Sequence, residues 1–474
     1  MESRSVNFAV EACAGELLVG SPDAKFARVG TDSRQAQAGD LFIALTGETF
    51  DGHMFLDEVA ARGVAAVMIA RGQRHLAAKL PATLAVIAVD DTRVALGKLG
   101  ARHRQDFSLP VVAVGGSNGK TTTKELIASV LKQAFDTLWS EASFNNDIGV
   151  PQTLLKLERR HGAAVFEVGT NHPGELAPLV RMIQPRVGVI TSIGREHLEF
   201  FGDVNGVAQE EGWLAELLPA DGALVINGDS EWASPLARRT KARVVTVGFG
   251  ESNAWRAKDL RVGEDGVTFE VVAPRSECSG EYRVRLLGRH QVPNALLALA
   301  AGTELGVHPE QIRQGLAACA ALKMRLQLWD AAGVRVLDDS YNANADSMLA
   351  ALQTLHDLPC SGRRVAVLGD MAEQGEHTEA AHREIGRRSA ELGIHRLLAV
   401  GRWARTTGEA ARKAGLADVT EFADVPGAAA AVNDLVQPGD VVLLKASRST
   451  RLERIGEALK GRAGAPSSVE RKAS

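Results

Sequence analysis

A glycine-rich loop between an apolar run and an amphipathic segment is the feature that most constrains this chain. The run Val111–Val114 is followed by Gly115-Gly116-Ser117-Asn118-Gly119-Lys120-Thr121-Thr122, and the next residues place apolar side chains on one helical face. Strand, loop and helix in this order form a phosphate cradle, in which backbone N–H groups converge on phosphate oxygens at a helix N-terminus. The segment therefore predicts a site for a nucleoside triphosphate.

The side chains of the loop support this interpretation. Lys120 supplies a compact positive charge for phosphate, and Thr121 supplies a hydroxyl for Mg²⁺. The loop is shorter than the general pattern G-x-x-x-x-G-K-[ST], because position 114 is Val. A glycine-rich turn that merely contains a lysine is the alternative, and the strand and helix on either side disfavour it. The predicted nucleotide-binding residues here are Gly116, Ser117, Asn118, Gly119, Lys120, Thr121 and Thr122.

Length and composition place the chain among ordinary globular proteins. Its 474 residues are too many for one compact core, and a usual domain size predicts about three domains. The charged fraction is 24% and the net charge is −4, so the sequence has no excess of basic residues for binding nucleic acid. The spacing of Cys13, Cys278, Cys319 and Cys360 excludes a zinc motif or disulfide scaffold. Because neither a signal peptide nor an apolar membrane span is visible, we expect a cytoplasmic protein.

The hydrophobic pattern predicts an α/β fold of three domains. A smaller N-terminal α/β domain, 1–107, has strands at 41–45, 64–70 and 84–89 and a helix at about 92–107. The central domain, 108–321, alternates strands with helices, as a mostly parallel sheet requires, and carries a small antiparallel appendage between about 243 and 288. A second doubly wound, Rossmann-like domain follows at 322–474, and its tail, 463–474, is expected to be disordered.

The pattern also predicts the elements of the second and third domains. Central strands are expected at 163–169, 186–193 and 222–228, with helices at 172–183, 204–218, 292–306 and 309–319. C-terminal strands are expected near 334–338, 364–369, 396–401 and 440–445, with helices at 345–357, 376–392, 402–414 and 449–460.

Two further polar side chains follow predicted strands of the central sheet. Glu167 ends the apolar run Ala163–Phe166, at the edge where open α/β sheets bind ligands, so its carboxylate is well placed for a metal. A helix cap or a loop ion pair is an equally open interpretation of this residue alone. His197 lies past the next strand, and a lone His is more often a hydrogen-bonded structural residue than a ligand.

Together these pieces resemble the Mur ligases, the ATP-dependent enzymes that add amino acids to the cell-wall precursor. Seven separate blocks occur in the order of that family, over nearly the whole chain, which is hard to obtain by chance. The blocks are Gly116–Thr122, Asn145–Pro151, Glu167–Asn171, His197–Glu199 with Phe201-Gly202, Gly288–Ala295, Arg325-Leu326 and Lys445–Arg448.

Within that family, the chain resembles the members that add a dipeptide. The blocks Asp338–Asn344, Ser347-Met348 and Val367–Glu373 carry this likeness. The resemblance implies a ligase of peptidoglycan synthesis, and so of cell shape and division, which joins D-alanyl-D-alanine to UDP-N-acetylmuramoyl-tripeptide and forms ADP and phosphate. The N-terminal blocks Thr31–Arg34, Gly39–Phe42, Gly47-Glu48 and Phe50–His53 are similar to the uridine-binding domain, so Ser33, Arg34, Thr46 and Asp51 are expected to bind this substrate.

The resemblance also implies roles for single residues around ATP. Lys120 would hold the β- and γ-phosphates, Thr121 and Glu167 one Mg²⁺, and His197 a second Mg²⁺. Arg325 would reach the γ-phosphate when the domains close. The nucleotide contacts are completed by Asn294, Asp339 and Asn342, and the substrate contacts by Asn145, Asn146, Lys445 and Arg448. The substrate carboxylate would attack the γ-phosphate, and the dipeptide amine would then displace phosphate from the acyl phosphate.

One position departs from the family pattern. Many Mur ligases carry a lysine, modified by CO₂ to a carbamate, on the helix after the His-containing loop. Counted from His197, this position is Glu211. Our hypothesis is that Glu211, or Glu210 if the register is one residue off, supplies the negative charge at the second metal directly. A solvated helical face is the alternative.

Three other functions remain open at this point. Another Mur ligase, the one that adds the third peptide residue, and folylpolyglutamate synthase use the same chemistry. An ATP-dependent switch protein that transfers nothing is the alternative outside the enzymes. We expect small-molecule substrates, no nucleic-acid partner and a monomer.

Overall fold

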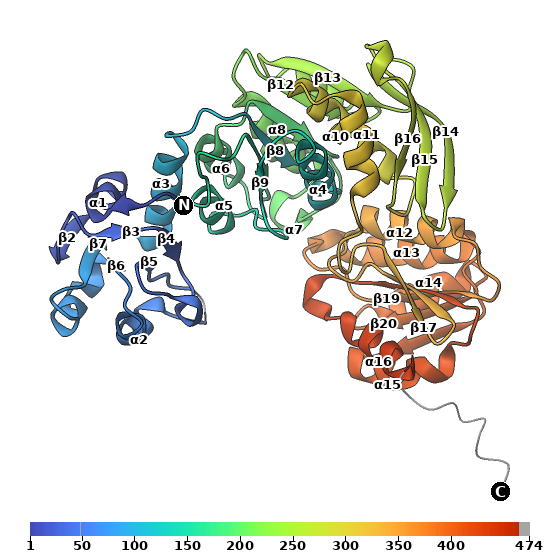
Figure 1. Cartoon of the computed structure of the whole chain (residues 1–474). Helices are drawn as coiled ribbons and strands as arrows, with labels where there is room; N and C mark the ends of the chain where they lie inside the picture. Colours follow the sequence, from blue (N-terminus) through green and yellow to red (C-terminus); the bar gives the residue numbers. More distant parts are fainter. Residues whose placement is uncertain (48, 464–474) are drawn as a thin grey trace, which may run out of the picture.

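The computed structural model describes residues 1–47 and 49–463 of the chain. Sheets covered by helices follow one another along the sequence, so the predicted α/β class is confirmed (Figure 1). Ala463 is the last residue of a helix, whereas the rest of the tail that we expected to be disordered, 464–474, lies outside the described residues, as does Glu48.

The N-terminal unit contains a sheet of order β2-β7-β6-β5-β4 and a small β1–β3 ladder. Strands β4 to β7 run parallel, and the apolar runs of β5, β6 and β7 are buried because parallel sheets are covered on both faces. The strands are β1 (Arg4–Ser5), β2 (Glu16–Val19), β3 (Lys25–Phe26), β4 (Arg28–Gly30), β5 (Asp40–Ile43), β6 (Ala66–Ala70) and β7 (Ala85–Val89), and the helices are α1 (Val6–Cys13), α2 (Leu56–Ala61) and α3 (Thr92–Arg104).

The central sheet has the order β16-β15-β14-β13-β12-β11-β8-β10-β9. Apolar side chains of α4, α10 and α11 bury one face of it, and those of α5, α6 and α8 bury the other. Its strands are β8 (Val111–Gly115), β9 (Thr137–Trp139), β10 (Ala163–Glu167), β11 (Val187–Ile190), β12 (Ala223–Asn227), β13 (Arg243–Gly248), β14 (Trp255–Gly263), β15 (Gly266–Val272) and β16 (Gly280–Val284). Its helices are α4 (Lys120–Leu131), α5 (Gly149–Leu154), α6 (Leu176–Ile183), α7 (Leu198–Phe201), α8 (Val204–Glu216), α9 (Ala233–Ala237), α10 (Gln291–Glu304) and α11 (Pro309–Ala318).

The antiparallel strands that we predicted on the central domain are present, and they are continuous with its sheet. Strand β14 starts parallel to β13, with Val247 opposite Trp255, and then pairs antiparallel with β15. The strands β14 to β16 therefore extend the central sheet. Their alternating pattern arises because an antiparallel sheet can leave one face to solvent.

The C-terminal unit has the sheet order β17-β18-β22-β19-β20-β21 and is parallel except for β17 at one edge. Helices α12, α13 and α14 bury one face, and α15 and α16 bury the other. The elements are β17 (Gln327–Ala331), β18 (Val334–Asp338), β19 (Arg364–Leu368), β20 (Arg396–Val400), β21 (Val419–Phe422), β22 (Val441–Lys445), α12 (Ala345–Asp357), α13 (Thr378–Glu391), α14 (Ala404–Lys413), α15 (Val425–Leu435) and α16 (Glu453–Ala463).

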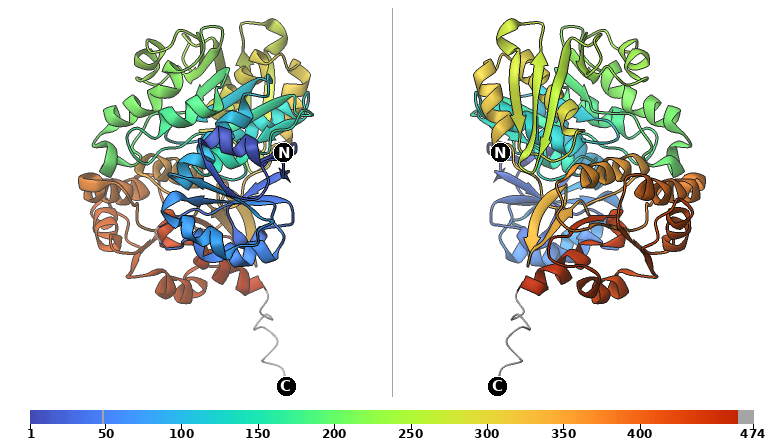
Figure 2. Two further views of the ribbon diagram at one scale, coloured as in Figure 1. Left: turned by 90° about the vertical axis from the view of Figure 1, so that its left-hand side faces the viewer. Right: turned by 90° about the vertical axis from the view of Figure 1, so that its right-hand side faces the viewer.

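The central unit joins the other two. The N-terminal unit lies to its left and the C-terminal unit below it in Figure 1, and the side views show the C-terminal helices against the underside of the central unit (Figure 2). The boundaries that we predict at 107/108 and 321/322 fall between α3 and β8 and between α11 and β17. Within the described part of the chain, every helix is too short or too polar to span a bilayer.

Candidate active site

The glycine-rich loop leads from β8 into α4 as the sequence predicted. Gly116 has φ 107°, and a Cβ atom there would lie 2.5 Å from the Thr191 hydroxyl, so the position requires glycine. Gly119 caps α4 with φ 85°. Among the described residues, the N–H groups of Lys120, Thr121 and Thr122 donate no hydrogen bond. These donors at the positive end of α4 are available to a phosphate.

The N–H groups of Gly116, Ser117 and Asn118, earlier in the loop, are engaged by the protein. Gly116 donates to Glu211 Oε2 at 2.6 Å, Ser117 to the Ser192 carbonyl at 2.7 Å and Asn118 to Ser192 Oγ at 3.0 Å. The N–H groups at the start of α4 are thus the ones left available to a ligand. The other bonds fix the shape of the loop.

A cleft of about 1510 Å³ extends from this loop to the C-terminal unit. It collects most of the predicted catalytic, nucleotide and substrate residues, and it lies at the carboxyl ends of strands of the central and C-terminal sheets, where open α/β sheets bind ligands. Those that line it are Ser117, Asn118, Gly119, Lys120, Thr121, Thr122, Asn145, Asn146, Glu167, His197, Asn294, Arg325, Asp339, Asn342, Lys445 and Arg448.

Lys120 is surrounded by acceptors in this cleft. Its Nζ donates to the Gly116 carbonyl at 2.5 Å and to Glu196 Oε2 at 3.2 Å. Burial would lower the pKa of Lys120, but the charges of Glu196, Glu211 and Glu167 outweigh it and raise that pKa, so the side chain is cationic. We did not predict Glu196, although a carboxylate next to His197 past a strand end was a signal for it.

Glu167 and Thr121 offer oxygen atoms to a cation. Glu167 Oε1 accepts a hydrogen bond from Asn145 Nδ2 at 2.8 Å, whereas the buried Oε2 is without a partner in the described residues. The Thr121 hydroxyl lies 3.4 Å from Ser143 Oγ. A free buried carboxylate oxygen and a hydroxyl suit Mg²⁺, which uses few protein ligands and takes the rest from phosphate and water. The described residues hold no group of three or more His, Cys, Asp or Glu side chains arranged for a metal.

His197 reaches across the cleft to the C-terminal unit. Its Nδ1 lies 2.5 Å from Oε2 of Glu373, and this hydrogen bond lowers the pKa of Glu373. Both residues have positive φ, 47° and 59°, a backbone conformation that costs about 1–2 kcal/mol for a residue other than glycine. The contact was not predictable, because Glu373 follows β19 in another unit.

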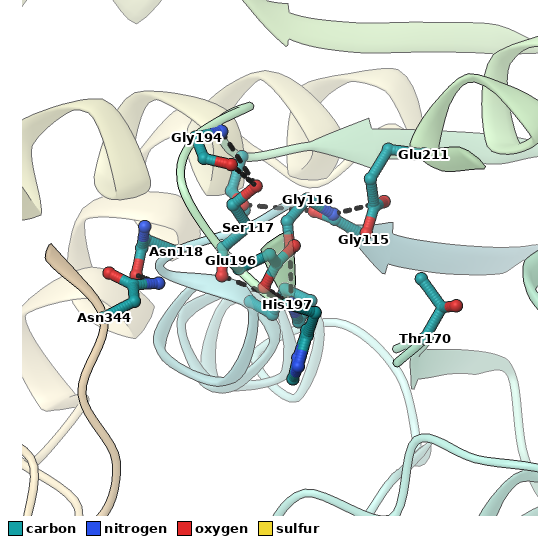
Figure 3. A network of polar contacts seen from close by, with 12 residues as sticks. Gly115, Gly116, Ser117, Asn118, Thr170, Gly194, Glu196, His197, Glu211 and Asn344 are labelled. Atoms are coloured by element: carbon teal, nitrogen blue, oxygen red, sulfur yellow. Dashed lines mark hydrogen bonds and ion pairs between the residues drawn. The ribbon is translucent and has the colours of Figure 1, made fainter. Parts of the chain in front are cut away.

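Glu211, our hypothetical ligand of the second metal, lies behind the glycine-rich loop, and its metal role stays a hypothesis. The carboxylate is fully buried and does not line the cleft. Figure 3 shows the Glu211 side chain at Gly116 of the glycine-rich loop. Asn344 contacts the same loop at Asn118. Burial raises the pKa of Glu211 to about 8, against the opposing charge of Lys120. Glu210 instead accepts from the N–H groups of Gly174 and Leu176 at the start of α6.

Arg325 lies in the connection between the central and C-terminal units. Its Nη2 is 3.3 Å from Ser143 Oγ, and its guanidinium lies 4.3 Å from the ring centre of Tyr341. The residues on either side, Met324 and Leu326, both have positive φ, 62° and 48°. The linker thus holds Arg325 in the cleft by a strained backbone.

The predicted residues at the far side of the cleft bond to one another. Lys445 Nζ donates to Asp339 Oδ2 at 2.6 Å and to the Asn342 carbonyl at 3.0 Å. The charge of Lys445 is thus balanced by Asp339, and its predicted contact with substrate stays a prediction. The Arg448 guanidinium pairs with Glu453 at 3.0 Å. Asn294 contacts the loop at Gly119, where a Cβ atom would lie 2.7 Å from its Oδ1.

The predicted uridine-binding residues lie outside this cleft, in the N-terminal unit. Ser33 and Arg34 follow β4, and Thr46 and Asp51 follow β5, at the carboxyl ends of two parallel strands. The Thr46 hydroxyl donates to Asp51 Oδ1 at 3.3 Å. The same edge contacts α5, where Gln152 Nε2 donates to Thr31 Oγ1 at 2.7 Å. Helix α5 follows Asn145 and Asn146 of the cleft, so it connects the two regions.

Comparison with known proteins identifies the family. The models of the Mur ligase family catalytic domain, the Mur ligase middle domain and the Mur ligase glutamate ligase domain match 25–104, 114–302 and 324–448. The UDP-N-acetylmuramoyl-tripeptide–D-alanyl-D-alanine ligase of Escherichia coli is 37% identical over 439 residues, 91% of this chain and 93% of that protein. The chain belongs to the Mur ligase family.

Solved Mur ligases share this fold. MurF from Acinetobacter baumannii superimposes with a TM-score of 0.88 and 32% identity, over 97% of this chain and 99% of that one. MurF from Thermotoga maritima in complex with ADP gives a TM-score of 0.77 and 26% identity, over 92% and 98%. The three units are thus arranged as in a Mur ligase. Mur ligases are ATP-dependent enzymes, which agrees with a cleft next to the glycine-rich loop.

Proposed function

We propose that this Mur ligase joins D-alanyl-D-alanine to UDP-N-acetylmuramoyl-tripeptide, with conversion of ATP to ADP and phosphate, in peptidoglycan precursor synthesis. The observation that carries the proposal is the 37% identity to the Escherichia coli ligase of that name over 91% of the chain. The cleft agrees with it, because a cationic Lys120 and the free N–H groups of α4 face the carboxylate of Glu167 across one cavity.

The residues of the cleft divide the binding of ATP between them. Lys120 and the first N–H groups of α4 bind the β- and γ-phosphates. Thr121 and Glu167 hold Mg²⁺, which neutralises phosphate charge when bound, and His197 is our candidate ligand for a second ion. Arg325 faces the γ-phosphate, and Asn294, Asp339 and Asn342 face the adenosine.

Alignment and charge neutralisation are the main tasks of the protein in this reaction. An oxygen of the tripeptide carboxylate attacks the γ-phosphorus, and the bond to ADP breaks to give an acyl phosphate. The dipeptide amine then attacks the acyl carbon, loses a proton, and phosphate leaves with the bridging oxygen. The uridine-binding edge is formed by Ser33, Arg34, Thr46 and Asp51. Helix α5 contacts this edge, and the peptide of the substrate extends along α5 to the reacting carboxylate in the cleft.

Acceptor-dependent phosphate release tests the proposal. With Mg²⁺ and ATP, the protein is expected to release phosphate only when both UDP-N-acetylmuramoyl-tripeptide and D-alanyl-D-alanine are present, and mass spectrometry should find the joined product. Release without the dipeptide would favour the switch protein. Release with a single amino acid and the dipeptide precursor, or with folate and glutamate, would favour the third-residue ligase or folylpolyglutamate synthase. We also expect a cytoplasmic monomer.

A further inference from the structure

The carboxylate of Glu196 lies in the cleft against the lysine that is expected to bind phosphate. Glu196 Oε2 is 3.2 Å from Lys120 Nζ, and the two side chains are 7% and 14% exposed. Glu196 therefore stands beside the place that a nucleotide phosphate must take when it reaches Lys120, and like charges this close in a partly buried site repel strongly.

Glu196 is held in this position by its neighbours in the loop. Its N–H donates to the Gly194 carbonyl at 3.0 Å, and the Gly194 N–H donates to Ser117 Oγ at 2.9 Å. On either side, Arg195 pairs with Asp346 and Glu384, and His197 with Glu373. These contacts restrain the backbone, so the carboxylate is kept near any phosphate bound in the cleft.

The surrounding charge is also negative. Glu167 lines the same cleft with a buried oxygen that has no partner in the described residues. Glu196 and Glu167 thus place two carboxylates around the single positive charge of Lys120. A nucleotide without a cation adds further negative charge to this excess, whereas a nucleotide with a divalent cation brings the charge that balances it.

We propose that Glu196 is a specificity-determining residue, which makes the site select a nucleotide with its divalent cation over the metal-free nucleotide. Glu196 competes with phosphate for Lys120, and a divalent cation removes that competition. The proposal rests on one part of the proposed function, the binding of nucleotide at Lys120. A purely structural ion pair would instead stabilise the fold and leave the metal dependence of nucleotide binding unchanged.

Calorimetric titration with ADP, in excess EDTA and in Mg²⁺, tests this without turnover. Glu196→Gln is expected to bind metal-free ADP at least about ten-fold more tightly than the parent, because one buried negative charge is removed. The affinity of Glu196→Gln for ADP with Mg²⁺ should change less. The ratio of the dissociation constant for metal-free ADP to that for ADP with Mg²⁺ is therefore expected to be smaller than in the parent. Glu199→Gln is the matched control, since Glu199 is exposed in the adjacent helix α7 outside the cleft, and should behave as the parent.

A second variant separates charge from folding. Glu196→Asp keeps the negative charge and should keep most of the discrimination, while thermal unfolding checks that each variant is folded. The proposal is overturned if Glu196→Gln changes the ratio by less than about two-fold, or if it binds metal-free ADP more weakly. If the parent binds ADP under neither condition, the proposed function fails instead.

Discussion

Lys120 is the residue on which the proposed chemistry depends most. It lies between the loop carbonyls and Glu196, and neighbouring carboxylates keep it charged in a buried site. The proposed reaction therefore depends on the positions of single charged side chains. Glu211 of α8 also contacts the glycine-rich loop, but its burial favours the neutral, protonated carboxyl group.

Removal of the Lys120 charge should abolish most of the turnover. We expect Lys120→Ala to lower kcat by about 10²–10³-fold or more, because a preorganised charged donor to the reacting phosphate is lost. Steady-state phosphate release measures this. Lys156→Ala, on the exposed surface, is the control and should keep the parent rate. A kcat within a few-fold of the parent would show that another group binds the γ-phosphate.

Glu211 should make stability depend on pH. Its folded pKa of about 8 lies above the ordinary value of 4.5, so the native state binds the proton more tightly. The contribution of Glu211 to the free energy of unfolding is full below pH 4.5 and is lost as pH rises through 8. Glu211→Gln has no such proton, so its stability relative to the parent should rise by of the order of 1 kcal/mol or more over that window.

Chemical denaturation of both proteins from pH 5 to 9 checks this. A difference in stability that is the same at every pH would show that burial does not shift the titration of Glu211.

At the scale of elements, the loop from Gly194 to His197 couples the nucleotide site to the C-terminal unit. Gly194 bonds to Ser117 of the glycine-rich loop, and Arg195 pairs with Asp346 of α12 at 2.7 Å and with Glu384 of α13 at 2.6 Å. These pairs are partly buried, so they are worth more than ordinary surface ion pairs.

Loss of the Arg195 contacts should loosen this coupling. We expect Arg195→Ala to lower kcat about ten-fold with a small change in thermal stability, because alignment of the units is lost while each core is intact. Hydrogen exchange should rise in the 194–198 loop. Arg289→Ala, which breaks a more exposed pair between the same units, is the control. Equal effects of both variants would contradict a special role for Arg195.

The elements with clear local signals were predictable from the sequence. Helix α12 begins after Asn344, which caps it through Ser347, and β18 is a buried apolar run, so both bounds match the prediction. Strands β17 and β21 are partly exposed edges, and α15 has a run of four alanines, Ala428–Ala431, at its centre, so none of the three gave a strong pattern. The antiparallel strands were found, but not their continuity with the central sheet.

The site was predictable where strand ends carry polar residues, as at Glu167 and His197. It was not predictable where two units meet, because the partners Glu373 and Tyr341 are set by tertiary packing rather than by spacing. Glu211 was placed at the right helix, but only the structure shows which side of the loop it faces.

At the scale of the whole molecule, the linker at Arg325 sets how the units meet. Met324 and Leu326 adopt positive φ on either side of it, and the Met324 carbonyl accepts from the N–H of Tyr341 at 3.2 Å. Arg325 and His197 line the same cavity where the central and C-terminal units meet.

A β-branched residue in this linker should open the molecule. Met324→Ile disfavours positive φ by about 1–2 kcal/mol, so we expect a larger radius of gyration in small-angle scattering and a lower kcat. Lys323→Ile, at the exposed neighbouring position, is the control. Unchanged scattering for Met324→Ile would show that the linker conformation does not hold the units together.

The central claim is that the cleft activates a substrate carboxylate by transfer of the γ-phosphate. The most direct test is to label both carboxylate oxygens of the tripeptide terminus with ¹⁸O and to analyse the phosphate released on reaction with D-alanyl-D-alanine. An acyl phosphate leaves with its bridging oxygen, so the account predicts one ¹⁸O atom in each phosphate. Phosphate without ¹⁸O, at the same yield of joined product, would contradict it.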